Sequence, residues 1–129
     1  DPVISAKIDL LEDLAGKIFR IVEEEPEKKP KAATFLNYYL PTTQKLLDSY
    51  ADFEESGVSG ENVSQAKQRI ASTMDNIVAG FERQLDQLYQ SDAMDVDSDI
   101  RVMEQMLRRD SGSVAEDFGL GAAVQQEEE

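Results

Sequence analysis

Apolar residues recur along most of the chain at alternating spacings of three and four, which places them on one face of a helix. A first helical segment ends at the glutamates before Pro26, because the residue before a proline disfavours helical backbone angles. A second segment begins near Pro30 and is kinked at Pro41, which lacks a backbone N–H. Gly57 and Gly60 close it with a loop. The apolar stripe of the first segment is Ile4, Ile8, Leu11, Ala15, Ile18 and Val22.

The third segment has the most regular pattern, a heptad-like seam that we expect to form an antiparallel core with the first segment. This seam consists of Val63, Ala66, Ile70, Met74, Ile77, Phe81, Leu85 and Leu88. A loop at 91–97 then leads into a short helix with Ile100, Met103 and Leu107 on its apolar side. The sequence therefore predicts an all-α fold: a small antiparallel helical bundle of three long helices, the second kinked at Pro41, plus a short C-terminal helix.

The composition changes near residue 110. A chain of 129 residues suits one small domain. Residues 110–129 contain no lysine or arginine, are interrupted by glycines and end in three glutamates. Such a segment cannot bury enough apolar surface to fold alone. We therefore predict a helical bundle domain at 1–109 and a flexible acidic tail at 110–129.

The charge and the missing residue types narrow the classes of function. A formal net charge of −14 argues against nucleic acid and against an anionic membrane surface, and favours basic protein partners or cations. The chain has no cysteine and no histidine, which removes thiol catalysis, disulfides, Cys/His zinc sites and imidazole chemistry. No segment is apolar enough to span a bilayer. The chain begins at Asp1, so we expect a fragment or processed form of a cytoplasmic protein, with any membrane association supplied by an upstream region.

Four aspartates lie close together in the sequence: Asp92, Asp95, Asp97 and Asp99. The last three match the first ligand positions of an EF-hand loop, but Ile100 and Met106 stand where that loop needs glycine and glutamate. A divalent-cation site of another kind is one interpretation. We favour the other, in which the acids cap the N-terminus of the following helix and complement its dipole.

An aromatic block precedes Pro41. Asn37, Tyr38 and Tyr39 could present a recognition surface, whereas aromatic residues at helical spacing more often fill a core around a kink. In the second case, a tyrosine or threonine hydroxyl would satisfy carbonyls that Pro41 leaves without a donor. We favour the core and retain the three residues as a candidate interaction surface.

Three blocks in this order resemble the bacterial 5-bromo-4-chloroindolyl phosphate hydrolysis protein family, the XpaC-like proteins. They are Phe35–Thr43 continuing to Leu47, Gly60–Asn62, and Asp92–Ile100 followed by Met103–Leu107. The resemblance covers roughly residues 15–110. It implies a link to the cell envelope or to toxic-anion stress, and a toxic-anion (tellurite) resistance partner of the TelA type. It implies no catalytic residues.

The function predicted from these observations is a non-enzymatic helical interaction module, with no catalytic residues and no required cofactor. The alternative is a metal-dependent phosphoester hydrolase with the four aspartates as ligands to a divalent cation and Tyr38 or Lys45 near the substrate. The protein partner, the oligomeric state and any catalysis are left open by the sequence.

Overall fold

The computed structural model describes the backbone of residues 2–117 and the side chains of residues 2–111. All regular structure in that range is helical, which confirms the predicted all-α class. The chain divides into two compact units, unit 1 at Asp1–Tyr89 and unit 2 at Gln90–Glu129. Unit 1 contains α1 (Pro2–Glu24), η1 (Pro26–Ala32), η2 (Phe35–Tyr39), α2 (Leu40–Ser56) and α3 (Glu61–Leu88), and unit 2 contains α4 (Gln90–Asp117).

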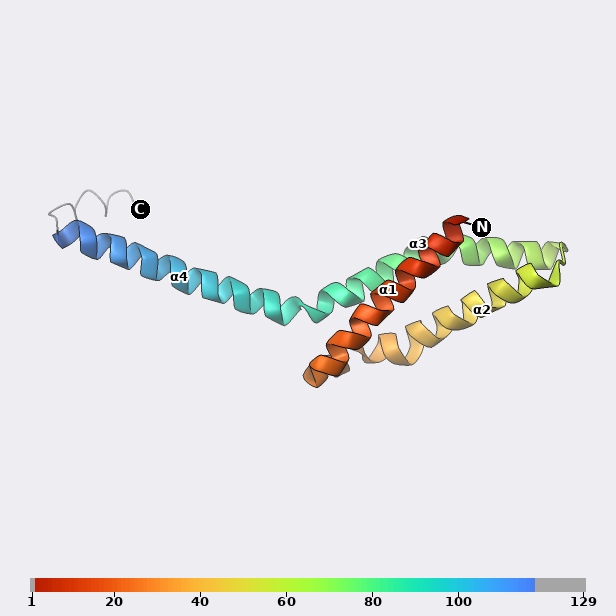
Figure 1. The fold of residues 1–129 in the computed structure, drawn as a ribbon, viewed down its shortest axis with the longest axis horizontal. Helices are drawn as coiled ribbons and strands as arrows, with labels where there is room; N and C mark the ends of the chain where they lie inside the picture. The colour runs from red at the N-terminus through yellow and green to blue at the C-terminus, as the bar shows by residue number, and fades with distance from the viewer. Residues whose placement is uncertain (1, 118–129) are drawn as a thin grey trace. The chain divides into compact units, whose positions relative to one another are not determined.

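The core of unit 1 lies mainly between α1 and α3, which pack side by side (Figure 1). Helix α1 buries Ile18 completely, together with apolar residues one helical turn before and after it. Helix α3 contributes Met74, Val78, Phe81 and Leu88. The predicted seam is largely confirmed, but Val78 is buried more deeply than Ile77, since α3 faces two neighbours.

The chain reverses direction after α1 through the 3₁₀ helix η1. Glu25 leaves the helical region (φ −129°, ψ 77°) directly before Pro26, as the clash between a proline and its preceding residue requires. The turn buries Lys28, which is only 4% exposed. Its ammonium lies 3.3 Å from Glu25 Oε2 and 5.5 Å from the ring centroid of Tyr89. A buried charge requires such partners, so Lys28 ties η1 to the end of α3.

The predicted kink at Pro41 takes the form of a wide π-helical turn, η2, before α2 begins. The backbone N–H of Leu40 donates to the Phe35 carbonyl, one residue further back than in an α-helix. Proline cannot donate to the preceding turn, and a widened turn is one way for the chain to accommodate it. The Thr43 hydroxyl donates to the Tyr39 carbonyl at 2.7 Å. This hydroxyl bonds the carbonyl four residues before Thr43, and not one of the carbonyls four or five residues before Pro41, so the predicted satisfaction of those carbonyls stays a prediction.

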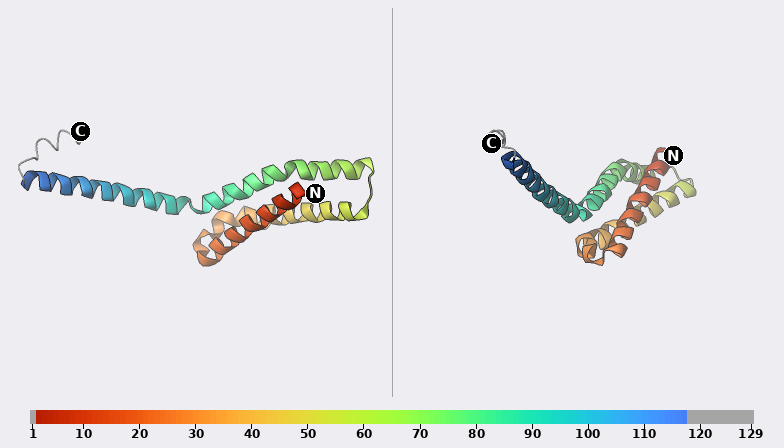
Figure 2. Two further views of the ribbon diagram at one scale, coloured as in Figure 1. Left: turned by 45° about the horizontal axis from the view of Figure 1, so that its top comes forward. Right: turned by 60° about the vertical axis from the view of Figure 1, so that its left-hand side comes forward.

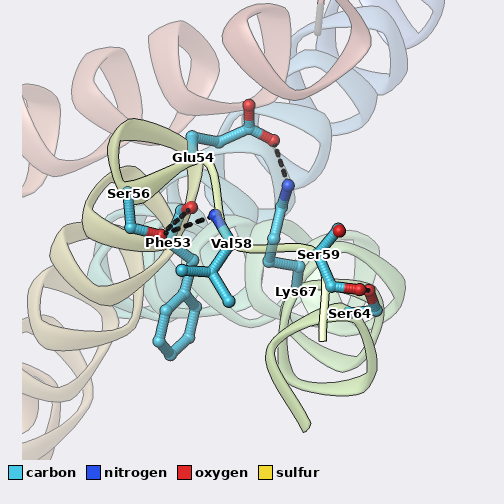
Figure 3. Close-up of polar contacts among 7 residues, drawn as sticks. All are labelled: Phe53, Glu54, Ser56, Val58, Ser59, Ser64 and Lys67. Atoms are coloured by element: carbon cyan, nitrogen blue, oxygen red, sulfur yellow. Dashed lines mark hydrogen bonds and ion pairs between the residues drawn. The ribbon is translucent and has the colours of Figure 1, made fainter. Parts of the chain in front are cut away.

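A tight loop joins α2 to α3. Gly57 has a positive φ of 67°, a conformation that favours glycine, and it ends α2. Figure 3 shows the polar contacts around this loop, where the Ser56 hydroxyl donates to the Phe53 carbonyl and accepts from the Val58 N–H. On the other side of the loop, Lys67 Nζ lies 2.6 Å from Glu54 Oε1. This ion pair joins the end of α2 to the start of α3.

Within unit 1, α1 and α3 run in the same direction and α2 runs the opposite way (Figures 1 and 2). The antiparallel pairing predicted for the first and third segments is therefore wrong. The physical reason is that η1 reverses the chain once and the Gly57 loop reverses it again, so two reversals restore the original direction. The antiparallel neighbours are α2 and α3.

The structure of α4 differs from two further predictions. Residues 91–97 are helical, not a loop, and the expected short helix is a 28-residue helix. The predicted boundary at residues 109 and 110 falls inside α4, which continues to Asp117. The rest of the predicted acidic tail, residues 118–129, lies outside the described residues. The spacing of the apolar residues from Ala93 onward is helical, and this outweighs the low helix propensity of the aspartates.

The Glu54–Lys67 pair gives the fold a testable pH dependence. The hydrogen bond and positive charge of Lys67 lower the pKa of Glu54, while Glu54 raises the pKa of Lys67. A lowered carboxyl pKa stabilises the fold above the ordinary pKa of glutamate, and this contribution is lost as pH falls through the lowered value. Glu54→Gln is therefore expected to lower the melting temperature slightly at neutral pH and to have no effect in strong acid.

The control for this prediction is Glu55→Gln, which removes the same charge from an exposed neighbour. Thermal melts of the two variants across acid pH separate loss of the ion pair from the change in net charge. Equal shifts in both variants at every pH would show that the pair adds nothing to stability.

Candidate functional site

The structure does not bring the four predicted metal-ligating aspartates together. They lie on one continuous helix, where Asp92, Asp95 and Asp99 share a side through their three- and four-residue spacings. Asp97 lies on the other side, and its Oδ2 is 3.0 Å from Arg101 Nε. In the described part of the chain, no group of three or more acidic, histidine or cysteine side chains is placed to hold a metal ion. Cation binding by these aspartates stays a prediction.

Helix capping accounts for only part of this acidic stretch. Asp92 lies in the first turn of α4, where a negative charge complements the helix dipole. The dipole effect falls off within one turn, and Asp95, Asp97 and Asp99 lie beyond it. For Asp97 and Asp99 the apolar face of the same helix supplies a different explanation, because both lie beside it.

An apolar seam runs along α4. We define the α4 seam as the residues that follow the heptad spacing of a helix-pairing face: Ala93, Val96, Ile100, Met103 and Leu107. Every one of these side chains is exposed in the structure. Unit 1 behaves differently, since every residue of the corresponding seams of α1 and α3 is buried or partly buried. An exposed stripe of large apolar side chains at this spacing is typical of a surface that binds another helix.

Acidic residues line both edges of the α4 seam. We call them the acidic flanks; Asp92 and Asp99 lie on one side and Asp97 and Glu104 on the other, at the heptad positions next to a helix-pairing interface. Arginines lie farther round the helix, where Arg101 pairs with Asp97 and Arg108 lies 4.0 Å from Glu104. The flanks are hidden in the sequence when residues 91–97 are taken as a loop. The signal was the spacing from Ile100 back to Val96 and Ala93.

The aromatic block divides between core and surface. Phe35 is buried and packs edge-to-face on Phe81, with ring centroids 4.8 Å apart. Tyr38 and Tyr39 are 60% and 54% exposed, and their rings lie 5.4 Å apart. The favoured core interpretation is therefore right for Phe35 and wrong for the two tyrosines. Asn37 is exposed as well, so the three candidate interaction residues lie at the surface.

A cavity of about 420 Å³ lies beside these tyrosines, between the π-helical turn and α3. Phe35 and Phe81 form its apolar part, and Tyr39, Arg83 and Gln84 contribute polar groups. Gly80 leaves space here, because a Cβ at this position would meet only Arg83, at 3.9 Å. The cavity combines an aromatic wall with one guanidinium, and none of the described residues that line it is acidic.

The family comparison agrees with the resemblance drawn from the sequence. The model of the 5-bromo-4-chloroindolyl phosphate hydrolysis protein family matches residues 4–103. The chain belongs to this family. The matched region covers nearly all of unit 1 and continues into α4 as far as Met103, so it includes the α4 seam except Leu107. Searches of curated proteins and of solved structures found no significant match.

The helices were also compared with the requirements for crossing a membrane. None of those formed by residues 2–117 has both the length and the apolar content that a spanning helix needs.

Proposed function

We propose that this member of the family is a non-enzymatic interaction module whose docking element is α4. The exposed α4 seam is the single observation that supports this function most directly. Helices in globular proteins gain most of their stability by burying an apolar face, and α4 buries none of the side chains described. A partner helix laid along the seam would supply that burial.

The buried area that the seam offers suits a reversible contact. Burying its large residues (Val96, Ile100, Met103 and Leu107) would contribute together about 6–12 kcal/mol, since each contributes about 1.5–3 kcal/mol. Association itself costs about 4–15 kcal/mol. The seam alone therefore gives weak to moderate affinity, and additional contacts beside it must contribute to a stable complex.

The family resemblance makes a toxic-anion resistance protein of the TelA type the first partner to test, in a role linked to the cell envelope or to toxic-anion stress. The purified partner is titrated into the full chain and into an Ile100→Ser/Leu107→Ser variant, and binding is followed by calorimetry. We expect binding to the full chain and a loss of at least about tenfold in affinity in the variant. Gln105→Ser, on the opposite face of α4, is the matched control.

Both seam residues are exposed, so the double variant should melt at the same temperature as the unaltered chain. If the variant binds as tightly as the control, α4 is not the docking element. If the TelA-type protein does not bind the full chain, capture from bacterial lysate on the full chain, compared with capture on the variant, decides whether another partner uses the seam.

The family's description favours one second candidate function, hydrolysis of an indolyl phosphate. This alternative uses a divalent cation at Asp92, Asp95, Asp97 and Asp99. Its test is turnover of 5-bromo-4-chloroindolyl phosphate by the full chain with Mg²⁺ or Mn²⁺. Turnover that is lost in Asp95→Asn/Asp97→Asn would overturn the non-enzymatic proposal.

A further inference from the structure

The acidic flanks identify the kind of partner that fits the α4 seam. We infer that the seam binds a helix whose own apolar seam is flanked by lysines or arginines. This inference rests on the proposed docking function of α4 and adds the chemistry of its partner. In paired helices, the residues beside the apolar seam face one another across the interface and select partners by charge.

Four of the five flanking positions of α4 between residues 92 and 106 bear a carboxylate, the fifth is Met106, and none bears a basic residue. A partner with acidic flanks would place like charges in contact along both edges of the interface. A partner with basic flanks would form ion pairs at the same positions. The existing pairs of Asp97 with Arg101 and Glu104 with Arg108 do not prevent this, because such exposed pairs within a helix contribute little to stability.

The acidic flanks also disfavour a second copy of the chain as the occupant. In a parallel pair of α4 helices, Asp92 would face Asp97 of the other copy, and Asp99 would face Glu104. An antiparallel pair would also bring acidic flanks together. The net charge of −14 on each chain adds further repulsion. The apolar spacing alone would allow self-association, and the flanking charges oppose it.

The acidic flanks also argue against an anionic membrane surface as the binding partner of the α4 seam. Amphipathic helices that lie on membranes place lysines and arginines beside the apolar face, where they attract lipid phosphates. Helix α4 has the opposite arrangement, with carboxylates at both edges of the seam and its arginines farther away. A basic helix is therefore the occupant that satisfies both the apolar seam and its charges.

The test uses peptides of residues 90–111 as probes of the full chain. In the basic peptide, Asp92, Asp97, Asp99 and Glu104 are each replaced with lysine, and the acidic peptide retains the native sequence. Both have the same apolar seam. A third peptide adds Ile100→Ser and Leu107→Ser to the basic one, which controls for non-specific attraction to an acidic chain. Binding is measured by fluorescence anisotropy at low and at high salt.

We expect the basic peptide to bind at least about tenfold more tightly than the acidic peptide, with the difference shrinking at high salt. The peptide with two serines should lose at least about tenfold in affinity. Equal binding of the basic and acidic peptides would overturn the charge inference and leave seam docking intact. Equal binding of the two basic peptides would also overturn the charge inference, and so would a lack of binding by all three peptides. The proposed docking function is tested separately by the calorimetric titration with the TelA-type protein.

A single-cysteine experiment tests whether the seam is free to receive a partner. The chain has no cysteine, so Met103→Cys on the seam and Gln105→Cys on the opposite face each introduce one thiol. We expect similar labelling rates for both variants of the free chain, and slower labelling at position 103 alone when the basic peptide is present. Slow labelling at position 103 in the free chain would show that the seam is already covered, and would overturn the inference.

Discussion

Replacing Phe81 with alanine is expected to lower the free energy of unfolding of unit 1 by about 3–5 kcal/mol. Phe81 is 3% exposed, belongs to the buried core and packs edge-to-face on Phe35. The substitution removes the ring's apolar contacts and the aromatic pair, and it enlarges the cavity between α3 and the π-helical turn. Small domains have net stabilities of about 5–15 kcal/mol, so this loss is a large fraction of the total.

The matched control is Phe19→Ala, which removes the same side chain from α1 at a position that is 47% exposed. Its effect should be much smaller, about 0.5 kcal/mol. Chemical denaturation of both variants gives the comparison, with circular dichroism as the readout. Similar losses in the two variants would show that Phe81 does not occupy the core position described here.

Amide hydrogen exchange should be at least about a thousandfold faster in α4 than in the centre of α3 in the free protein. Amides at Met74, Val78 and Phe81 lie in a helix whose side chains form the core, so they exchange only when unit 1 unfolds. Helix α4 buries none of its described apolar side chains, and its amides can exchange through local opening. Exchange followed by mass spectrometry on peptides from 94–107 and 70–82 measures this difference.

The same experiment connects stability to the proposed function. Binding of the basic peptide should slow exchange in α4 and leave the α3 peptides unchanged, because the partner buries the seam alone. Protection of α4 that already equals that of α3 in the free chain would contradict the prediction. It would mean that the seam is packed in the free protein.

The sequence was most informative where structure depends on neighbours three or four residues apart. It predicted the all-α class, the end of α1 before Pro26 and a departure from regular α-helix before Pro41, since each depends on local backbone chemistry. It failed at 91–97, where a cluster of aspartates was interpreted as a loop although the apolar spacing continued through it. The prediction gave more weight to the cluster of charged residues than to the apolar spacing. In the structure the apolar spacing prevails, and these residues are helical.

The candidate site could be predicted only in part from the sequence. The sequence contained the aspartates and the apolar residues of α4, but treating the aspartates as metal ligands required a loop that could converge on one point. A continuous helix spaces them along its axis and around its sides, which leaves Asp97 away from Asp92 and Asp99. On the same helix, Asp97 joins Glu104 as one edge of the seam, and this pairing is visible only once the helix is known to be continuous.

Apart from residues 91–97, the helical segments and their apolar faces follow from the amino-acid sequence, because both depend on chemistry within one or two turns. Long-range packing sets the common direction of α1 and α3, the burial of Phe35 beside the exposed Tyr38 and Tyr39, and the position of Lys28 at the Tyr89 ring. These outcomes depend on which distant segment covers each face, and amino-acid spacing along one helix contains no information about that neighbour.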